Sequence, residues 1–318
     1  TNETVFNLTE LPKRLAVIGG GPVGCELAQS FRRFGSEVTI LEMMPQFLVR
    51  EDPDAADILR RSLEREGLRL ALNAKIERIE SGDSGKVIHF TIDGKAQTAE
   101  VDAILAGAGR APNVQGLGLE TVGVEYDEGT GVKVDDKLRT TNRNIFAAGD
   151  ICTPYKFTHT ADAAAQIVVA NALFMGRSKF SRLVIPWATY TDPEIAHVGM
   201  YEADAKAQGI ELDTYTAPFV DVHRAIAEGE EEGFVKIHCR RGTDKIVGAT
   251  IVASHAGEMI SEITTCIVHG IGLGKIAGVI HPYPTQAEAI KKCAGLYKRT
   301  KLTPRVAGLI KKWLSFSR

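Results

Sequence analysis

The chain has 318 residues, a net charge of −2, a hydrophobic fraction of 44% and a charged fraction of 25%. This composition is typical of a soluble globular protein, and the length is enough for two domains and part of a third. The near-balanced charge gives no reason to expect nucleic acid as the main partner. No apolar run reaches the roughly 18 residues of a membrane span. The N-terminus lacks the layout of a signal peptide, so we expect a cytoplasmic location.

The cysteines limit the chemistry that this sequence can carry. They lie far apart and form no CxxC pair: Cys25, Cys152, Cys239, Cys266 and Cys293. An odd, dispersed set argues for a reducing compartment and against a disulfide framework. We therefore expect no redox dithiol here, and expect Cys25 and Cys152 to be small core residues. The histidines are dispersed as well, so no metal site is predicted.

The first strong element is a strand at 14–18, which leads through a glycine-rich turn into a helix and a second strand at 37–41. The turn has the GxGxxG spacing and consists of Gly19, Gly20, Gly21, Pro22, Val23 and Gly24. Its first glycine permits the tight turn, its second lets the backbone approach a pyrophosphate, and its third lets the helix pack close to the strand. Free N–H groups at the helix start then face the phosphates. The strand–turn–helix context disfavours the alternative, a glycine turn without a ligand.

Glu42 ends the second strand, about 20 residues after the turn, where a carboxylate can accept hydrogen bonds from ribose hydroxyls. The same charge repels a 2′-phosphate, and no Lys or Arg follows before Arg50. The sequence therefore predicts NAD(H) rather than NADP(H) as the dinucleotide. The less favoured alternative is a solvated acid at a strand end.

Hydrophobic periodicity predicts the elements that follow. Before residue 112 these are a helix at 54–66, strands at 68–72, 75–80, 86–92, 99–101 and 103–106, and hairpin turns at 82–85 and 93–94. A strand at 144–150 and a helix at 160–175 come next. From Pro186 the pattern is that of an α+β domain, with strands at 188–191, 234–239 and 245–252 and helices at 202–208, 257–269 and 285–297.

Three of these elements carry further candidate residues. Asp150, at the end of its strand, is placed to accept from a sugar-like hydroxyl, although a turn or cap role is the simpler interpretation. The positive end of the helix near Thr160 would favour an anionic reduced flavin. Thr285 and Glu288 have the spacing of a capping box, which gives Glu288 a structural interpretation.

The C-terminus carries an apolar stripe at helical spacing with basic residues around it. The stripe consists of Val306, Leu309, Ile310, Trp313 and Leu314, and the basic residues are Arg305, Lys311, Lys312 and Arg318. A basic amphipathic helix can lie on a membrane surface. Such a stripe more often packs on its own protein, and that is our expectation here.

Five motifs occur in order along nearly the whole chain: GGGPVGCELA, AGAGRAPN, TTNRNIFAAGDI, TDPEIAHVG and HPYPTQAEA. With them the chain resembles the FAD-dependent pyridine nucleotide–disulfide oxidoreductases, a family that includes dihydrolipoamide dehydrogenase and mercuric reductase. The resemblance implies an α/β Rossmann-type NAD(H) domain at 1–112 and the C-terminal segment of an FAD-binding domain at 113–182. An α+β dimerisation domain at 183–318 would follow, and the protein would be a homodimer.

The resemblance also implies roles for single residues. Glu26 would lie beside the nicotinamide, and Gly109 would contact the NAD through its backbone. Asp150 would hold the ribityl chain of the flavin, while Thr158 and His159 would approach its ring. A His–Glu pair from the dimerisation domain would reach the other subunit's flavin and disulfide.

Two departures from the family pattern change what the resemblance implies about the flavin site and the catalytic histidine. The chain opens with the linker that normally follows the family's N-terminal half, so we expect a segment of about 100–150 residues, with the redox cysteines and most of the FAD site, to be absent. The spacing His-Pro-Thr-x-x-Glu, counted back from Glu288, puts Tyr283 at the histidine position, with His281 two residues earlier. Mercuric reductases resemble the chain in this tyrosine, but the chain ends without their vicinal cysteine pair. Tyrosine, with a reference pKa of about 10, is a poor base at neutral pH.

Three hypotheses remain open at the level of sequence. In the first, the intact protein moves a hydride from NADH to FAD and electrons on to a disulfide or metal ion. In the second, motivated by the absent cysteines, the chain is a nucleotide-binding and dimerising module without catalysis. The third, an NAD dehydrogenase without flavin, is least favoured because no His–Asp or Ser-Tyr-Lys arrangement is placed for direct hydride transfer.

Overall fold

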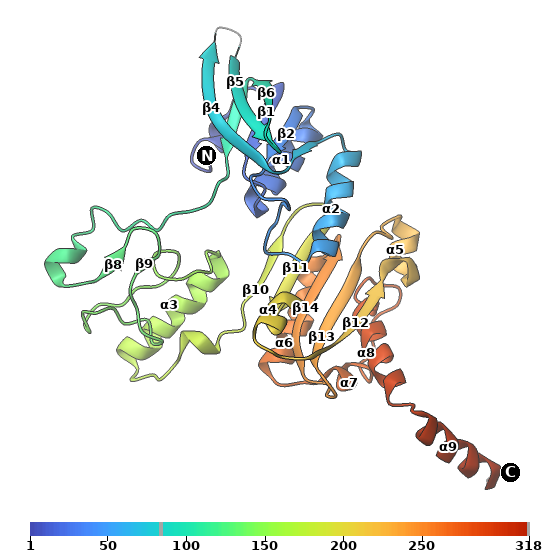
Figure 1. The fold of residues 1–318 in the computed structure, drawn as a ribbon. Coiled ribbons are helices and arrows are strands. Elements are labelled where there is room, and N and C mark those ends of the chain that lie inside the picture. Colours follow the sequence, from blue (N-terminus) through green and yellow to red (C-terminus); the bar gives the residue numbers. More distant parts are fainter. Residues whose placement is uncertain (83–84, 317–318) are drawn as a thin grey trace. The chain divides into compact units, whose positions relative to one another are not determined.

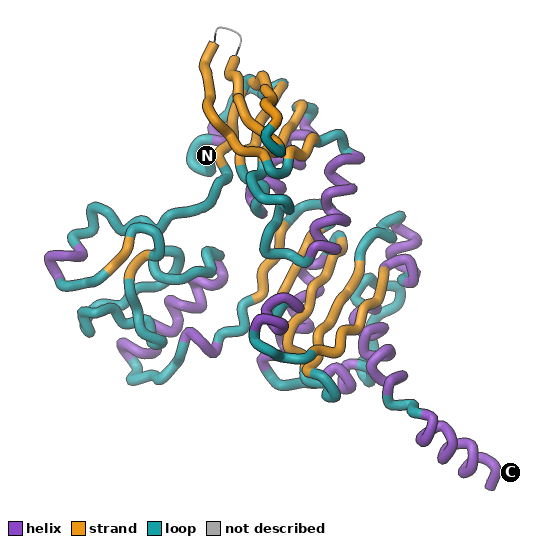
Figure 2. The backbone as a smooth tube through the Cα atoms, viewed as in Figure 1, coloured by secondary structure: helices purple, strands orange, loops and turns teal. Residues whose placement is uncertain are grey.

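The computed structural model describes residues 1–82 and 85–316 (Figures 1 and 2). The chain divides into two compact units: Thr1–Ala108 with Pro186–Arg318, and Gly109–Ile185. The domain boundaries implied by the family resemblance stay a prediction. The fold class is confirmed, as the sheets described next show.

The first unit begins with a parallel sheet whose strand order is β3-β2-β1-β7. Its elements are β1 Arg14–Ile18, α1 Pro22–Phe34, β2 Glu37–Leu41, α2 Pro53–Arg65, β3 Arg69–Ala71 and β7 Ala103–Ala106. Every neighbouring pair in this sheet is parallel. This is the strand order of a Rossmann half, in which ligands bind at the carboxyl ends of the strands. The strands predicted at 14–18, 37–41 and 103–106 are confirmed.

β1 is buried on both faces, as a central parallel strand must be. Leu15 and Val17 join the cluster beneath α1, which includes Cys25. Ala16 faces the other way, toward Ile88 and Phe90 of an antiparallel sheet. That sheet consists of β4 Ala74–Gly82, β5 Gly85–Ile92 and β6 Lys95–Val101.

The antiparallel sheet modifies two of the expectations. β6 begins at Lys95 rather than at residue 99, because its polar first half pairs with β5 without needing an apolar pattern. The turn at 93–94 is confirmed, with φ of 50° at Asp93 and 76° at Gly94. Asp83 and Ser84, in the other predicted turn, lie outside the described residues, and Gly82 pairs with Gly85 on either side of them.

The second unit contains β8 Tyr126–Asp127, β9 Gly131–Val132 and α3 Thr158–Leu173. The strand predicted at 144–150 is wrong: this segment makes one isolated bridge, between Phe146 and Arg139. The residues just before Phe146 form a turn instead, in which the N–H of Ile145 donates to the Asn142 carbonyl at 2.9 Å. α3 begins two residues earlier than predicted, at Thr158.

The remainder of the first unit is an antiparallel sheet with helices, in the strand order β10-β11-β14-β13-β12. The strands are β10 Pro186–Thr189, β11 Glu194–Gly199, β12 Leu212–Pro218, β13 Phe234–Arg240 and β14 Ile246–Ala253. The helices are α4 Glu202–Ala207, α5 His223–Glu228, α6 Ala256–Val268, α7 Leu273–Ile276, α8 Glu288–Thr300 and α9 Pro304–Phe316. Short 3₁₀ turns lie in this unit at Val5–Asn7 and Phe219–Asp221, and in the second unit at Leu119–Val122 and Phe180–Arg182. α6 packs on β11 and β14, and α8 on β12 and β13.

The C-terminal helices overturn two expectations. The capping box at Thr285 and Glu288 is wrong: the Thr285 hydroxyl donates to the Pro282 carbonyl at 2.8 Å, and α8 begins only at Glu288. The expected packing of the C-terminal stripe is also wrong, because α9 buries none of its residues. Among the described residues, no helix has the length and apolar character needed to cross a membrane.

Candidate functional site

The glycine turn at the carboxyl end of β1 is shaped by close backbone contacts. Gly19 has φ of +102°, and a Cβ there would lie 2.7 Å from the Gly107 carbonyl oxygen. A Cβ at Gly24 would lie 2.2 Å from the Gly19 carbonyl oxygen. At Gly21, by contrast, an added Cβ would meet no atom within 4 Å. The protein's own backbone therefore requires the first and third glycines, while the middle glycine faces open space, as a contact to pyrophosphate needs.

The start of α1 presents its backbone donors at this turn. Pro22 takes the first helical turn, and Gly21, the N-cap, makes no side-chain capping bond. Val23 is 38% exposed at the same end. The first N–H groups of a helix have no partner within the helix, so they and the helix dipole suit a phosphate.

Glu42 is hydrogen-bonded to the turn itself. Its Oε2 accepts from the Gly20 N–H at 2.7 Å and its Oε1 accepts from the Met44 N–H at 2.8 Å. These bonds fix the half-buried carboxylate beside the glycine turn. A carboxylate has about four lone-pair sites, so two backbone bonds leave capacity for ribose hydroxyls.

Glu26, on α1, reaches the strand connection between β10 and β11. Its Oε1 accepts from the Tyr190 N–H at 2.8 Å. One turn later, Gln29 donates to the Asp192 carbonyl at 2.9 Å and accepts from the Asp192 N–H at 2.8 Å. Arg33 forms an ion pair with the Asp192 carboxylate at 2.6 Å. α1 is thus hydrogen-bonded along one side to residues 190–192.

The second unit holds the remaining predicted cofactor residues. Asp150 is exposed, 3.8 Å from Arg110, and follows Gly149, whose φ is +83°. Thr158 and His159 are exposed in the first turn of α3, and the His159 ring stacks on Phe157 with centroids 5.4 Å apart. Gly109 has φ of +119°, with no atom within 4 Å of an added Cβ. Gly109, Asp150, Thr158 and His159 thus lie in one unit, and Gly19–Glu42 lie in the other.

The residues before α8 fall into two pairs. Tyr283 is 71% exposed, and its hydroxyl is hydrogen-bonded to His223 Nδ1 at 3.1 Å. The His281 side chain is only 5% exposed, and its Nε2 lies 3.1 Å from Glu262 Oε1 on α6. The structure therefore separates the two candidates for the family histidine: the tyrosine faces outward and the histidine is held inward.

Glu288 has one oxygen without a partner. Its Oε1 lies 3.8 Å from Lys292 Nζ, whereas its Oε2 is buried and accepts no hydrogen bond in the described structure. His281 Nδ1 is buried without a partner in the same way. Buried polar atoms without a partner are uncommon in folded proteins, and each has an explanation such as a bound water or ion, local strain or a catalytic role.

Sequence reasoning did not identify His223 or Glu262 as members of this group. His223 lies 60 residues from Tyr283 in the chain, and Glu262 lies 19 residues from His281. No spacing rule joins residues so far apart, so the sequence carries no signal for either pair.

The cysteines have no thiolate character in the described structure. All five are free, and four of them are buried. Burial raises the pKa of Cys25, and it raises the pKa of Cys152 to about 11. Both are therefore inert core thiols, as expected. Among residues 1–82 and 85–316, no cluster of three or more His, Cys, Asp or Glu side chains is arranged to hold a metal ion.

A buried polar cluster lies where residues 51–52 meet the antiparallel sheet. Glu51 accepts hydrogen bonds from Trp187 Nε1 at 3.0 Å and from the Tyr201 hydroxyl at 2.6 Å. The His197 ring stacks on Tyr201 with centroids 3.5 Å apart. Burial raises the pKa of Glu51 and lowers the pKa of His197 to about 3.

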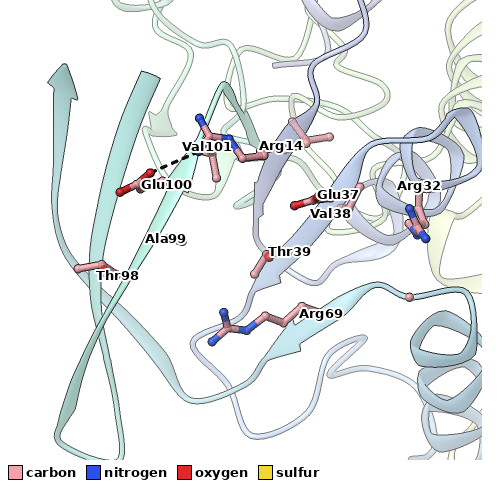
Figure 3. Close-up of a pocket in the computed structure, with 12 residues that line it drawn as sticks. Arg14, Arg32, Glu37, Val38, Thr39, Arg69, Thr98, Ala99, Glu100 and Val101 are labelled. Atoms are coloured by element: carbon pink, nitrogen blue, oxygen red, sulfur yellow. Dashed lines mark hydrogen bonds and ion pairs between the residues drawn. The ribbon is translucent and has the colours of Figure 1, made fainter. Parts of the chain in front are cut away.

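A pocket of about 440 Å³ lies at the amino ends of the parallel strands, opposite the end that carries the glycine turn (Figure 3). Arg14, Glu37 and Arg69, which line it, are the first residues of β1, β2 and β3. Arg14 forms ion pairs with Asp102 and Glu100. Ligands of such sheets bind at the carboxyl ends of the strands, so this pocket is not the candidate dinucleotide site.

Known proteins are similar to this chain over most of its length. Over 294 residues, the chain is 35% identical to a dihydrolipoyl dehydrogenase of Cupriavidus necator, covering 92% of this chain and 62% of that protein. Over 294 residues it is 33% identical to a mercuric reductase of Staphylococcus aureus, covering 92% of this chain and 54% of that protein. The chain thus spans a little over half to about three fifths of the length of these relatives.

Solved structures give the same result. LpdA from Mycobacterium tuberculosis superposes with a TM-score of 0.85 at 31% identity, covering 92% of this chain and 63% of that one. RclA from Escherichia coli, an HOCl-induced flavoprotein disulfide reductase, has a TM-score of 0.83 at 30% identity, covering 92% of this chain and 66% of that one.

Two family models account for most of the sequence. The model described as pyridine nucleotide-disulphide oxidoreductase matches residues 1–166. The model of the dimerisation domain of the same proteins matches residues 185–294. With the Rossmann strand order, the glycine turn and these matches, the chain belongs to the pyridine nucleotide-disulphide oxidoreductase family.

Proposed function

We propose that the protein is an FAD-dependent oxidoreductase in which residues 1–318 bind NADH and form a homodimer. In the whole protein, hydride passes from NADH to FAD and electrons pass on to a disulfide or a metal ion. The observation that carries this proposal is the glycine turn with Glu42 hydrogen-bonded beside it. The names of the relatives support the class of reaction, and the matched dimerisation domain supports the homodimer.

NADH is the dinucleotide that the turn suits better. The Glu42 carboxylate is held 2.7 Å from the Gly20 N–H, where an added 2′-phosphate would meet a fixed negative charge. Two free hydroxyls on the ribose instead donate to the carboxylate. The pyrophosphate then lies over Gly21 at the start of α1.

The second unit supports part of a flavin site. Asp150 is an exposed acceptor for a ribityl hydroxyl, and Thr158 and His159 begin a helix whose dipole favours a negative flavin ring. The Thr160 hydroxyl is buried without a partner in the same helical turn. When bound, FAD supplies the two-electron relay between NADH and the acceptor. Gly109 would add a backbone contact to the NAD.

Tyr283 and His223 are the proton-handling pair that we propose. Their hydrogen bond, at 3.1 Å, lets the imidazole take or supply the proton that a phenol alone exchanges poorly near neutral pH. His281 with Glu262 positions the turn that carries Tyr283. Glu288, with its unpartnered buried oxygen, is the acid that a second subunit would complete. Glu26 would lie beside the nicotinamide.

The alternative is a nucleotide-binding and dimerising module without catalysis. The described cysteines favour it, because none of them has a thiolate-stabilising environment. The two proposals differ in one measurable property, because only the oxidoreductase contains a reducible flavin.

Two measurements test the proposal. The purified whole protein should show a flavin absorption band that bleaches on addition of NADH, and NADPH should act more weakly. Glu42→Gln should weaken NADH binding by about tenfold or more, since a charge-assisted hydrogen bond contributes about 1.5–3 kcal/mol. Glu37→Gln, at the other end of the same strand, is the matched control and should bind NADH normally. If the protein binds NADH but contains no flavin, the oxidoreductase proposal fails and the alternative, a module without catalysis, is supported.

A further inference from the structure

The C-terminal segment differs in charge from the rest of the chain. Residues 289–318 contain nine Lys or Arg residues and no Asp or Glu. Since the whole chain has a net charge of −2, residues 1–288 carry −11. The last two elements, α8 and α9, therefore end an acidic protein in a basic segment, which begins after Glu288.

α9 separates apolar from basic side chains around its axis. At 3.6 residues per turn, its large apolar residues fall within an arc of about 160° whose midpoint is at Val306, with Trp313 about 20° away. Leu309, Trp313 and Phe316 in this arc are 69%, 67% and 80% exposed. Arg305 and Lys312 lie at one border of the arc, and Lys311 lies on the opposite face. The helix is 13 residues long, so its apolar face is about 20 Å long.

The charges on the polar face of α9 differ from those on an ordinary solvent-exposed helix face. The exposed face of α2 mixes signs, with Asp57 bonded to Arg60 and Arg61 within the helix. A helix that packs its apolar stripe on protein needs no bias of charge on its outer face. α9 has cations alone there, and the last turn of α8 adds Lys298 and Arg299 just before it. The feature that requires explanation is thus the coincidence of an exposed apolar arc with a uniformly basic segment.

We propose that α9 binds the surface of a lipid bilayer that contains anionic lipids. Its apolar arc enters the boundary between headgroups and acyl chains, and Trp313 lies at the interface, where indole rings are favoured. The lysines and arginines of residues 298–312 contact the lipid phosphates. Neither α9 nor any other described helix can cross the bilayer, so the contact is peripheral. This proposal does not depend on the oxidoreductase function.

The test is co-sedimentation of the full chain with vesicles of phosphatidylcholine alone or with added phosphatidylglycerol. Binding is expected only to the anionic vesicles, with loss at high salt and a blue shift of Trp313 fluorescence. The triple substitution of Arg305, Lys311 and Lys312 by Gln should weaken binding about 100-fold, at about fivefold per charge. The matched control replaces Lys95, Lys206 and Lys245, which are exposed elsewhere, by Gln and should bind normally.

A second substitution tests the apolar arc. Leu309→Ser with Trp313→Ser should abolish vesicle binding while the circular dichroism and thermal midpoint of the protein stay unchanged, because α9 buries no residue. Equal binding to neutral and anionic vesicles would overturn the role of charge. Absence of vesicle binding overturns the proposal. If these substitutions changed only the oligomeric state, the arc would instead be a contact between copies of the chain.

Discussion

Acid should destabilise the first unit through His197, a histidine that the fold keeps neutral. The ring is fully buried between Trp187 and Tyr201. Its Nε2 donates to the Gly199 carbonyl at 3.1 Å, and its Nδ1 lies 2.9 Å from the Thr250 hydroxyl. Burial lowers the pKa of His197 from 6.5 to about 3.

The sign and size of the effect follow from proton linkage. Because the folded pKa is depressed, the unfolded chain binds the proton more readily, and stability falls as pH drops below 6.5 toward about 3. At pH 5 the unfolded histidine is protonated and the folded one is still neutral. The difference of about 1.5 pH units corresponds to about 2 kcal/mol of lost unfolding free energy relative to pH 8. The pKa of Glu51 is raised by burial, so its contribution has the opposite sign.

A comparison of variants isolates His197 from Glu51 and from other titrating groups. Guanidinium unfolding is followed by Trp187 fluorescence in a Trp313→Phe background, since the chain has two tryptophans. His197→Gln should lose about 2 kcal/mol less than the parent between pH 8 and pH 5. His255→Gln, at an exposed histidine, should keep the full dependence on pH. An unchanged pH dependence in the His197 variant would refute the reasoning.

Three further predictions concern the site. Gly24→Ala should lower both the thermal midpoint and NADH binding, because its Cβ would lie 2.2 Å from a backbone oxygen. The control is Gly295→Ala in the interior of α8, where an added Cβ meets no atom; it should be neutral or stabilising by up to about 1 kcal/mol. Gly21→Val should weaken NADH binding more than tenfold in a fluorescence titration without lowering the thermal midpoint; a lower midpoint would show that the open face is needed for folding. In the flavin-loaded protein, Tyr283→Phe and His223→Asn should alter the pH profile of acceptor reduction in the same way and leave the rate of flavin reduction by NADH unchanged; independent effects would separate the pair.

The sequence predicted the parts of the fold that depend on neighbours in the chain. β1, the glycine turn and β2 form a continuous segment, and each residue type there meets a local steric demand, such as φ of +102° at Gly19. The strand predicted at 144–150 failed for the converse reason. It has an apolar pattern, but a strand also requires a paired neighbour, and the described pairing is one bridge to Arg139.

The candidate site depends more heavily on distant contacts. β11 and β12 were not predicted, because in an antiparallel sheet their identity depends on pairing with β14 and β13. The Glu26 bond to Tyr190 joins residues 164 positions apart. Spacing rules reach about one helical turn or one hairpin, so these contacts had no sequence signature.

α1 connects the candidate dinucleotide site to the antiparallel sheet. Its N-terminus faces the space over Gly21, and its side chains at Glu26 and Gln29 bond the backbone of residues 190–192. The bond to Tyr190 also fixes the direction of the Glu26 carboxylate. Because a carboxylate accepts up to about four hydrogen bonds, this contact is compatible with the proposed place beside the nicotinamide. The helix that would bind the pyrophosphate is therefore fixed by hydrogen bonds to the segment that matches the family's dimerisation domain. This is the arrangement expected if each subunit completes the other's site.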